Sequence, residues 1–208
     1  MRALADEHDA LLIADEMITG FGRTGRYWGV SHSGVRPDIV TLGKAFGGGF
    51  PLSGLLTTDA ISKAKPWSNP SGSSSSYGGN ALGAAAGAAA LRVIDEERLV
   101  DNARTVGAFM LRELQSMVED YPFVGHARGR GLFLGLELVR DKRTKEPLAR
   151  AVTERLFRQL VSRGLLTMAY ASSFRLQPSL TMDESTARNG LAIVREVFDS
   201  WKLDGSWR

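Results

Sequence analysis

Two charged residues of this sequence, one acidic and one basic, each follow a short apolar run. A carboxylate and an amine held close together can take part in catalysis. Asp15 follows the run 11–14, and Lys44 follows the run 38–42 after a single glycine. Apolar runs of this length predict strands. The carboxyl ends of neighbouring parallel strands meet at one edge of a sheet, where α/β proteins bind their ligands. We therefore expect Asp15 and Lys44 to lie together at that edge.

A carboxylate and an amine placed in this way suit pyridoxal phosphate (PLP). The cofactor needs a lysine amine for its aldehyde and a carboxylate beside its ring nitrogen. Charge pairing with the carboxylate keeps that nitrogen protonated, and a freed lysine can move protons. Each residue also has a plainer interpretation, because Lys44 could be a surface lysine and Asp15 could be a helix cap.

Two further segments contain candidate binding residues. The serine-rich stretch 73–76, with Ser75 and Ser76 at its end, leads into a helix expected to begin near Ala81. Hydroxyls and free amides before a helix N-terminus are suited to holding phosphate, although a flexible linker has the same composition. Arg175 lies in an apolar strand, where an unpaired charge is costly. Its partner is either a carboxylate of the protein or that of a substrate.

The elements that must position these residues change in character near residue 100. Before it, we expect strands at 11–14, 38–42 and 53–57, followed by a helix of small residues over 81–94. These strands are apolar without alternation, which predicts that both of their faces are covered. This part is expected to be a partial PLP-binding large domain, residues 1–100, with a mostly parallel sheet and helices.

Residues 101–208 are expected to form a smaller α+β domain, so the fold class as a whole is α/β. Amphipathic helices alternate here with four expected strands. Those strands are residues 124–128, 131–139, 165–168 and 174–177. The last helix is expected to open on a capping box formed by Thr181 and Glu184.

Three features are interpreted as structural. Glu16 neighbours Asp15 but points in a different direction, so we do not expect it to take part in the chemistry. The glycines within residues 20–25 lack the spacing of a dinucleotide-binding loop and indicate a tight turn. Residues 140–145 mix charges of both signs and indicate a solvated turn.

The composition is that of an ordinary globular protein, with 43% hydrophobic and 24% charged residues. The absence of cysteine excludes disulfides and thiolate metal sites, and the three histidines share no ligand spacing, so we expect no metal site. A net charge of +3, mostly scattered, does not indicate nucleic-acid binding. Acidic residues near the N-terminus argue against a signal peptide. No apolar run reaches the roughly 20 residues of a membrane span, so we expect a cytoplasmic protein.

Five segments, in this order and spacing, carry a family resemblance that extends over essentially the whole chain. They are residues 12–25 (LIADEMITGFGRTG), 37–44 (PDIVTLGK), 47–51 (GGGFP), 75–80 (SSYGGN) and 128–132 (RGRGL). Together they resemble the class III, or omega-amino-acid, aminotransferases of PLP fold type I. The resemblance implies a PLP-dependent enzyme that transfers an amino group between an amine or amino acid and a 2-oxo acid, by a ping-pong mechanism. It also implies a homodimer with active sites at its interface.

The resemblance implies a role for each matching residue. Asp15 would pair with the pyridine nitrogen of PLP, and Lys44 would carry the internal aldimine. Met17 would pack behind the ring, where the family usually has valine. Ser76, preceded by Ser75, would reach the phosphate of the neighbouring subunit's cofactor, where the family usually has threonine.

Two other positions concern the substrate and the subgroup. Arg175 matches the arginine that in many members binds the α-carboxylate of the donor or acceptor. Ile18 stands where many members have a glutamine that contacts the phenolic oxygen of the cofactor, and isoleucine cannot make that hydrogen bond. Some members that act on amines with pyruvate have an apolar residue at this position.

The resemblance covers only the C-terminal half of the family subunit. The segments that grip the phosphate and stack on the ring lie in the other half. Two alternatives therefore remain open. One is a catalytically silent fragment that associates with an N-terminal half encoded elsewhere, and the other is a PLP-dependent aminomutase or racemase.

Overall fold

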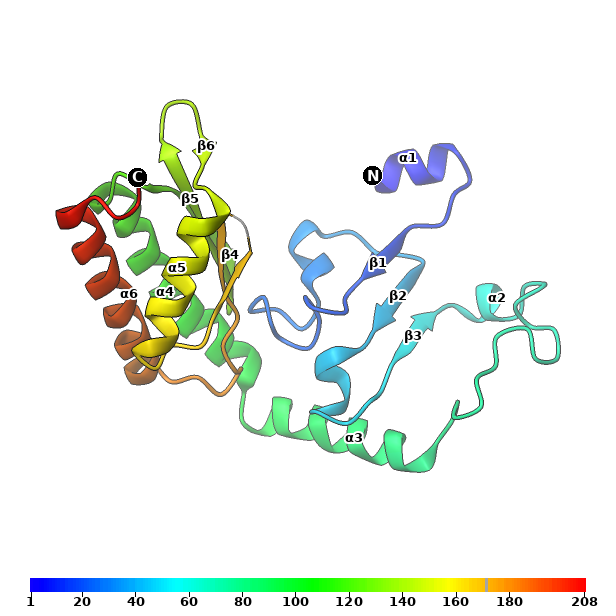
Figure 1. Ribbon diagram of the computed structural model, residues 1–208. Helices are drawn as coiled ribbons and strands as arrows, with labels where there is room; N and C mark the ends of the chain where they lie inside the picture. The colour runs from blue at the N-terminus through cyan, green and yellow to red at the C-terminus, as the bar shows by residue number, and fades with distance from the viewer. Residues whose placement is uncertain (171) are drawn as a thin grey trace. The chain divides into compact units, whose positions relative to one another are not determined.

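The computed structural model describes residues 1–170 and 172–208. The chain divides into two compact units, Met1–Val100 and Asp101–Arg208, and most of their elements are labelled in Figure 1. Among the described residues, no helix combines the length and the apolar character needed to cross a membrane.

The first unit contains a three-stranded sheet in the order β1-β2-β3. The strands are β1 (Ile13–Asp15), β2 (Ile39–Leu42) and β3 (Gly54–Thr57). β1 and β2 run parallel, with Asp15 in register with Thr41. The predicted parallel pair is therefore confirmed, whereas β3 runs antiparallel to β2.

Helices connect and flank these strands. They are α1 (Arg2–Glu7), η1 (Gly29–Ser33), η2 (Lys44–Gly47), α2 (Asp59–Ser62) and α3 (Ala81–Glu96), where η marks a 3-10 helix. α3 packs against the η2 segment at a short distance. A Cβ atom at Gly87 would lie 3.6 Å from Phe46 Cε2 of η2 and 2.7 Å from Cδ2 of Leu52, which follows η2. The small residues of α3 therefore serve tight packing, as the sequence predicts.

The expectation that both faces of the first sheet are covered is wrong for this chain. Ile13, Leu55 and Leu56 have exposed fractions of 56%, 40% and 52%. A continuous apolar run reflects the burial of a strand within a complete layered fold. The described residues of the first unit do not supply the layers that would cover these side chains.

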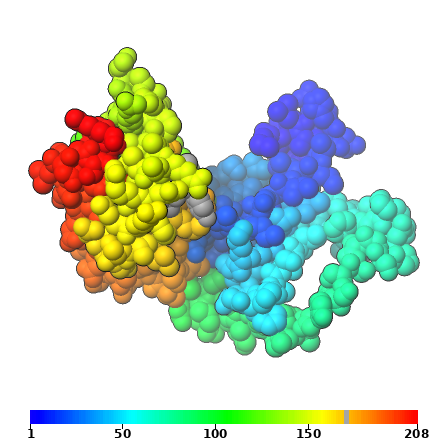
Figure 2. All heavy atoms as spheres, in the orientation of Figure 1, coloured from blue at the N-terminus to red at the C-terminus, as the bar shows by residue number. Residues whose placement is uncertain are grey.

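The second unit contains an antiparallel sheet in the order β4-β5-β8-β7, with β6 paired to β5. Its strands are β4 (Val124–Arg130), β5 (Phe133–Asp141), β6 (Glu146–Pro147), β7 (Met168–Tyr170) and β8 (Ser173–Leu176). Its helices are α4 (Leu99–Asp120), α5 (Arg150–Ser162) and α6 (Glu184–Asp204). The β5–β6 hairpin projects from the rest of the unit (Figure 2), and its tip is the exposed turn predicted for residues 140–145.

One hydrophobic core joins this sheet to its helices. Alternate strand residues such as Leu134, Leu136 and Phe174 are buried together with residues of α4, α5 and α6. Trp201 of α6 is fully buried, and its indole nitrogen donates to Gln159 Oε1 at 2.7 Å. The second unit therefore has a core of its own.

The predicted capping box at the start of α6 is wrong. The N-cap is Asp183, whose Oδ1 accepts a hydrogen bond from the backbone N–H of Thr186 at 2.6 Å. The Thr181 hydroxyl instead lies 2.8 Å from that of Ser179. A carboxylate makes a stronger hydrogen bond to a helix amide than a hydroxyl does, and the helix starts beside the carboxylate.

This cap predicts a pH-dependent contribution to stability. The hydrogen bond from the backbone of Thr186 lowers the pKa of Asp183 below its ordinary value of 3.8. Such a group stabilises the fold above its unfolded pKa and loses that contribution as the pH falls through its folded pKa. We expect Asp183→Ala to lower the melting temperature at neutral pH, and the difference from wild type to shrink below pH 3.8. Thermal melts followed by circular dichroism check this, and an unchanged difference in acid would contradict it.

Candidate active site

Asp15 and Lys44 lie at the same edge of the first sheet. Asp15 ends β1, and Lys44 follows β2 after Gly43. Because β1 and β2 are parallel neighbours, both residues lie at the carboxyl ends of their strands. Both side chains are exposed there, so a ligand at this edge can reach them.

The Asp15 carboxylate is oriented by its own loop and by the neighbouring strand. Its Oδ1 accepts hydrogen bonds from the backbone N–H of Met17 at 3.1 Å and from the Thr41 hydroxyl at 3.3 Å. The sequence did not single out Thr41. The pairing of the two strands would have identified Thr41, because it lies directly opposite Asp15 in the parallel pair.

A close backbone contact fixes the segment that leads to Lys44. Gly43 is extended, and a Cβ atom there would lie 2.5 Å from Met17 Sδ. A side chain at this position would force Met17 to shift. Lys44 then adopts a left-handed conformation with a φ of 48°, which turns the chain away from the sheet into η2. The ends of the two strands are thus packed directly on each other.

Glu16 organises the loop after β1 and is not part of the exposed edge. It is 2% exposed. Its carboxylate accepts hydrogen bonds from the N–H groups of Gly29 and Val30, at 2.9 and 2.6 Å, and from the Thr19 hydroxyl at 2.5 Å. The structural interpretation of Glu16 is confirmed, since it ties the loop to the start of η1.

An aromatic contact joins the same loop to the segment that contains Lys44. The rings of Phe21 and Phe46 are stacked, with centroids 5.2 Å apart and an interplanar angle of 5°. Phe46 belongs to η2, which begins at Lys44. Half-buried Ile18 lies in this loop after β1. The isoleucine has no polar atom to offer a ligand.

The predicted phosphate-binding serines lie in the exposed loop before α3. Ser75 lines a hollow of about 740 Å³ that also includes Phe46 and Asn80, whereas Ser76 is exposed beside it. Two amides in the first turn of α3 itself already have an acceptor. The Asn80 side chain accepts hydrogen bonds from the N–H groups of Leu82 and Gly83, at 2.9 and 3.2 Å.

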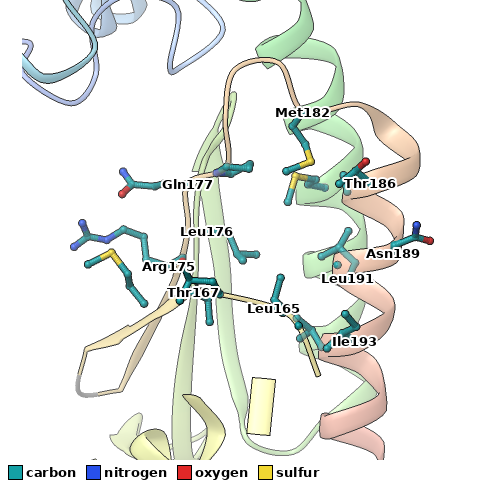
Figure 3. A pocket seen from close by; sticks show the side chains of 18 residues that line it. Leu165, Thr167, Arg175, Leu176, Gln177, Met182, Thr186, Asn189, Leu191 and Ile193 are labelled. Atoms are coloured by element: carbon teal, nitrogen blue, oxygen red, sulfur yellow. Dashed lines mark hydrogen bonds between the residues drawn. The ribbon is translucent and has the colours of Figure 1, made fainter. Parts of the chain in front are cut away.

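Arg175 belongs to the second unit, in the middle of β8. Its neighbours Phe174 and Leu176 enter the core, so strand alternation places Arg175 on the opposite face of the sheet. Figure 3 shows this arrangement: Leu176 points toward α6, and Arg175 and Gln177 point away from it. A largely apolar pocket of about 610 Å³ lies between β8 and α6, and its lining includes Arg175 and Gln177 as well as Leu176.

The residues at the edge of the first sheet fit PLP. The cofactor requires a fixed carboxylate for its ring nitrogen and a primary amine for its aldehyde. Asp15 is fixed by two donors, and Lys44 follows the adjacent parallel strand. This donor set is suited to PLP and poorly suited to a metal ion, because an ammonium group is no metal ligand.

Comparison with known proteins agrees with this chemistry. The 5-aminovalerate aminotransferase of Pseudomonas putida is 36% identical over 95% of this chain and 46% of its own length. The leucine/methionine racemase of Thermococcus litoralis is 33% identical over 92% of this chain and 42% of its own length. The chain thus spans about half the length of the curated relatives it matches.

The fold also matches that of solved transaminases. A PLP-bound amine transaminase from an uncultivated Pseudomonas species superposes with a TM-score of 0.89 at 35% identity, covering 96% of this chain and 46% of the other. The predictions of PLP fold type I and of PLP as the family's cofactor are confirmed. The family model described as aminotransferase class-III matches residues 1–198, so this chain belongs to the class III aminotransferase family.

Proposed function

We propose that this chain contributes Asp15 and Lys44 to a PLP-dependent aminotransferase that moves an amino group between an amine or amino acid and a 2-oxo acid. The observation that carries the proposal is the placement of these two residues on adjacent parallel strands, with Asp15 held by Met17 and Thr41. Family membership supports the same reaction class. In this proposal the first unit is part of the PLP-binding large domain and the second unit is the small C-terminal domain.

When bound, PLP supplies an electron sink for the electron pair that remains when a substrate C–H bond breaks. Asp15 holds the positive charge of the ring nitrogen beside it, which strengthens that sink. Lys44 would hold the cofactor through Nζ, and the same atom would hold and move a proton for the substrate. Met17, packed on Gly43, would pack behind the cofactor ring.

The remaining predicted residues bind the substrate and position the cofactor. Arg175 holds a substrate carboxylate through its planar guanidinium group. Ser75 and Ser76 approach the phosphate of the partner subunit's cofactor in a homodimer. Ile18 would lie near the phenolic oxygen of the cofactor and could not donate a hydrogen bond to it. We place this enzyme in the cytoplasm, with no role for nucleic acid or membrane.

Borohydride reduction tests the proposal directly. We expect the chain, mixed with PLP and reduced, to carry a phosphopyridoxyl group on Lys44, which peptide mass spectrometry locates. The variant Lys44→Ala should lose this adduct and keep only slow labelling of exposed lysines such as Lys63. Equal labelling of Lys44 and Lys63 in the wild-type chain would contradict the proposed site and would favour a catalytically silent chain.

Racemisation is a second candidate, because a relative named leucine/methionine racemase is 33% identical to this chain. The two reactions differ in their need for an acceptor. An aminotransferase must return the amino group to a 2-oxo acid, whereas a racemase interconverts the enantiomers of one amino acid. Loss of optical rotation from an L-amino acid, without any added 2-oxo acid, would favour the racemase.

A further inference from the structure

The backbone of Lys44 is held in a conformation that is unfavourable for a lysine. Its φ of 48° lies in the left-handed region, which is disfavoured for a residue with a Cβ atom. Such a conformation persists only where the surrounding structure imposes it. Across Lys44, the backbone N–H of Phe46 donates a hydrogen bond to the carbonyl oxygen of Gly43 at 3.0 Å. This bond closes a tight turn in which Lys44 is the first central residue.

The loop that follows Asp15 contacts both ends of this turn. At the first end, a Cβ atom on Gly43 would lie 2.5 Å from Met17 Sδ and 3.2 Å from Met17 Cε, so the thioether rests directly on the Gly43 backbone. At the second end, the ring of Phe46 stacks on that of Phe21, with centroids 5.2 Å apart. Side chains of one loop therefore hold the turn on both sides of its lysine.

The loop is itself anchored at both contact residues. The backbone N–H of Met17 donates to Asp15 Oδ1 at 3.1 Å. Phe21 is 2% exposed, and Trp28 packs edge-on against it with centroids 5.2 Å apart. A loop anchored in this way can oppose the strain at Lys44 and can fix the distance between the lysine and the acid.

We propose that Met17 and Phe21 are positioning residues, a clamp that keeps the turn at Lys44 closed and holds the lysine amine beside Asp15. Both act through the residues that flank Lys44. This inference rests on the proposed function and deepens it, because the loop that begins at the acid also sets the position of the amine. The plainer interpretation is ordinary packing, in which the thioether can move aside without any effect on Lys44.

Gly43→Ala and Met17→Ala test the first contact of the clamp. The backbone of Gly43 is extended, with a φ of −178°, so alanine can adopt it and the added methyl acts through its contact with the thioether. Overpacking disfavours the closed turn, and truncation of Met17 removes one of its two supports. We therefore expect hydrogen exchange at the Phe46 amide to be about tenfold faster in each single variant.

The double variant, with both substitutions, gives the sharper result. The alanine methyl at position 43 then fills part of the space that the thioether leaves, so the Phe46 amide should exchange more slowly than in either single variant. Independent effects would instead add, and the double variant would exchange fastest. Gly83→Ala is the matched control. A Cβ atom there would meet Leu52 and Phe50 at ordinary distances of 3.4 and 3.7 Å, and exchange at the Phe46 amide should be unchanged.

The reactivity of the Lys44 amine is a second readout, which ordinary packing would not change. After reduction with PLP and borohydride, the adduct yield at Lys44 relative to that at the exposed Lys63 should fall about tenfold in each single variant and recover in the double variant. Phe21→Leu removes the stacked ring and should lower the same ratio. Circular dichroism melts check that each variant is folded.

The outcomes separate this inference from the proposed function. Unchanged exchange at Phe46 in Met17→Ala, or a double variant that exchanges faster than both single variants, would overturn the inference. An adduct ratio that stays constant while exchange changes would overturn it as well. Because hydrogen exchange involves no PLP, it decides the inference even if the wild-type chain forms no adduct at Lys44, a result that would count against the proposed function alone.

Discussion

Glu16→Ala is expected to destabilise the first unit by roughly 3 kcal/mol, because each buried donor left unsatisfied costs about 1–3 kcal/mol. The carboxylate of this 2%-exposed residue accepts three hydrogen bonds, two of them from the backbone of Gly29 and Val30. Because Asp15 directly precedes Glu16, the same change should reduce the yield of the Lys44 adduct.

Hydrogen exchange measures this effect where it arises. The amides of Gly29 and Val30 should exchange on the order of 100-fold faster in Glu16→Ala, which corresponds to about 2.7 kcal/mol of local stability. Glu16→Gln retains one acceptor oxygen, so its loss of local stability should be smaller. Glu7→Ala, in the exposed helix α1, serves as the control and should change nothing. Unchanged exchange at Gly29 and Val30 would show that the carboxylate is not what holds the loop.

Gly107→Ala is expected to destabilise the second unit by roughly 3 kcal/mol, at the upper end of the cost of overpacking. Alanine is favoured over glycine in a helix interior by about 1 kcal/mol, so the expected sign is opposite to the propensity. The reason is a backbone contact. A Cβ atom at Gly107 of α4 would lie 2.1 Å from the carbonyl oxygen of Gly131 and 2.2 Å from its carbonyl carbon.

A second helical glycine provides the matched control. A Cβ atom at Gly190 of α6 would meet only Leu165 Cδ1, at an ordinary distance of 3.5 Å. Gly190→Ala should therefore stabilise the unit by up to about 1 kcal/mol. Urea unfolding followed by far-UV circular dichroism compares the two variants. Shifts of the same sign would contradict a close approach of α4 to Gly131.

The chemical residues of the candidate site were predictable from local sequence. Asp15 and Lys44 each follow an apolar run, and a run of this kind indicates a strand whose end lies at the edge of a sheet. Thr41 was not predictable in the same way. Its role depends on the register between β1 and β2, which is set when the two strands pair and is not encoded in either strand alone.

The errors at the fold level have a common physical origin. Ile13 and Leu56 have the character of buried strand residues, but burial depends on layers that the described part of the first unit does not supply. At α6, Thr181 and Asp183 both have side chains that cap helices. The residue types alone could not show which of the two caps α6, because the capping residue is set by the position at which the backbone enters the helix.

The backbone at Lys44 has a consequence for protein design. A left-handed conformation costs a residue with a Cβ atom roughly 1–2 kcal/mol, and glycine avoids this cost. Lys44 adopts such a conformation, with a φ of 48°. A procedure that optimises this sequence for stability alone would be drawn to replace Lys44 with glycine, and would remove the amine that we propose to react with PLP. Stabilised variants of this chain should therefore be designed with position 44 held fixed.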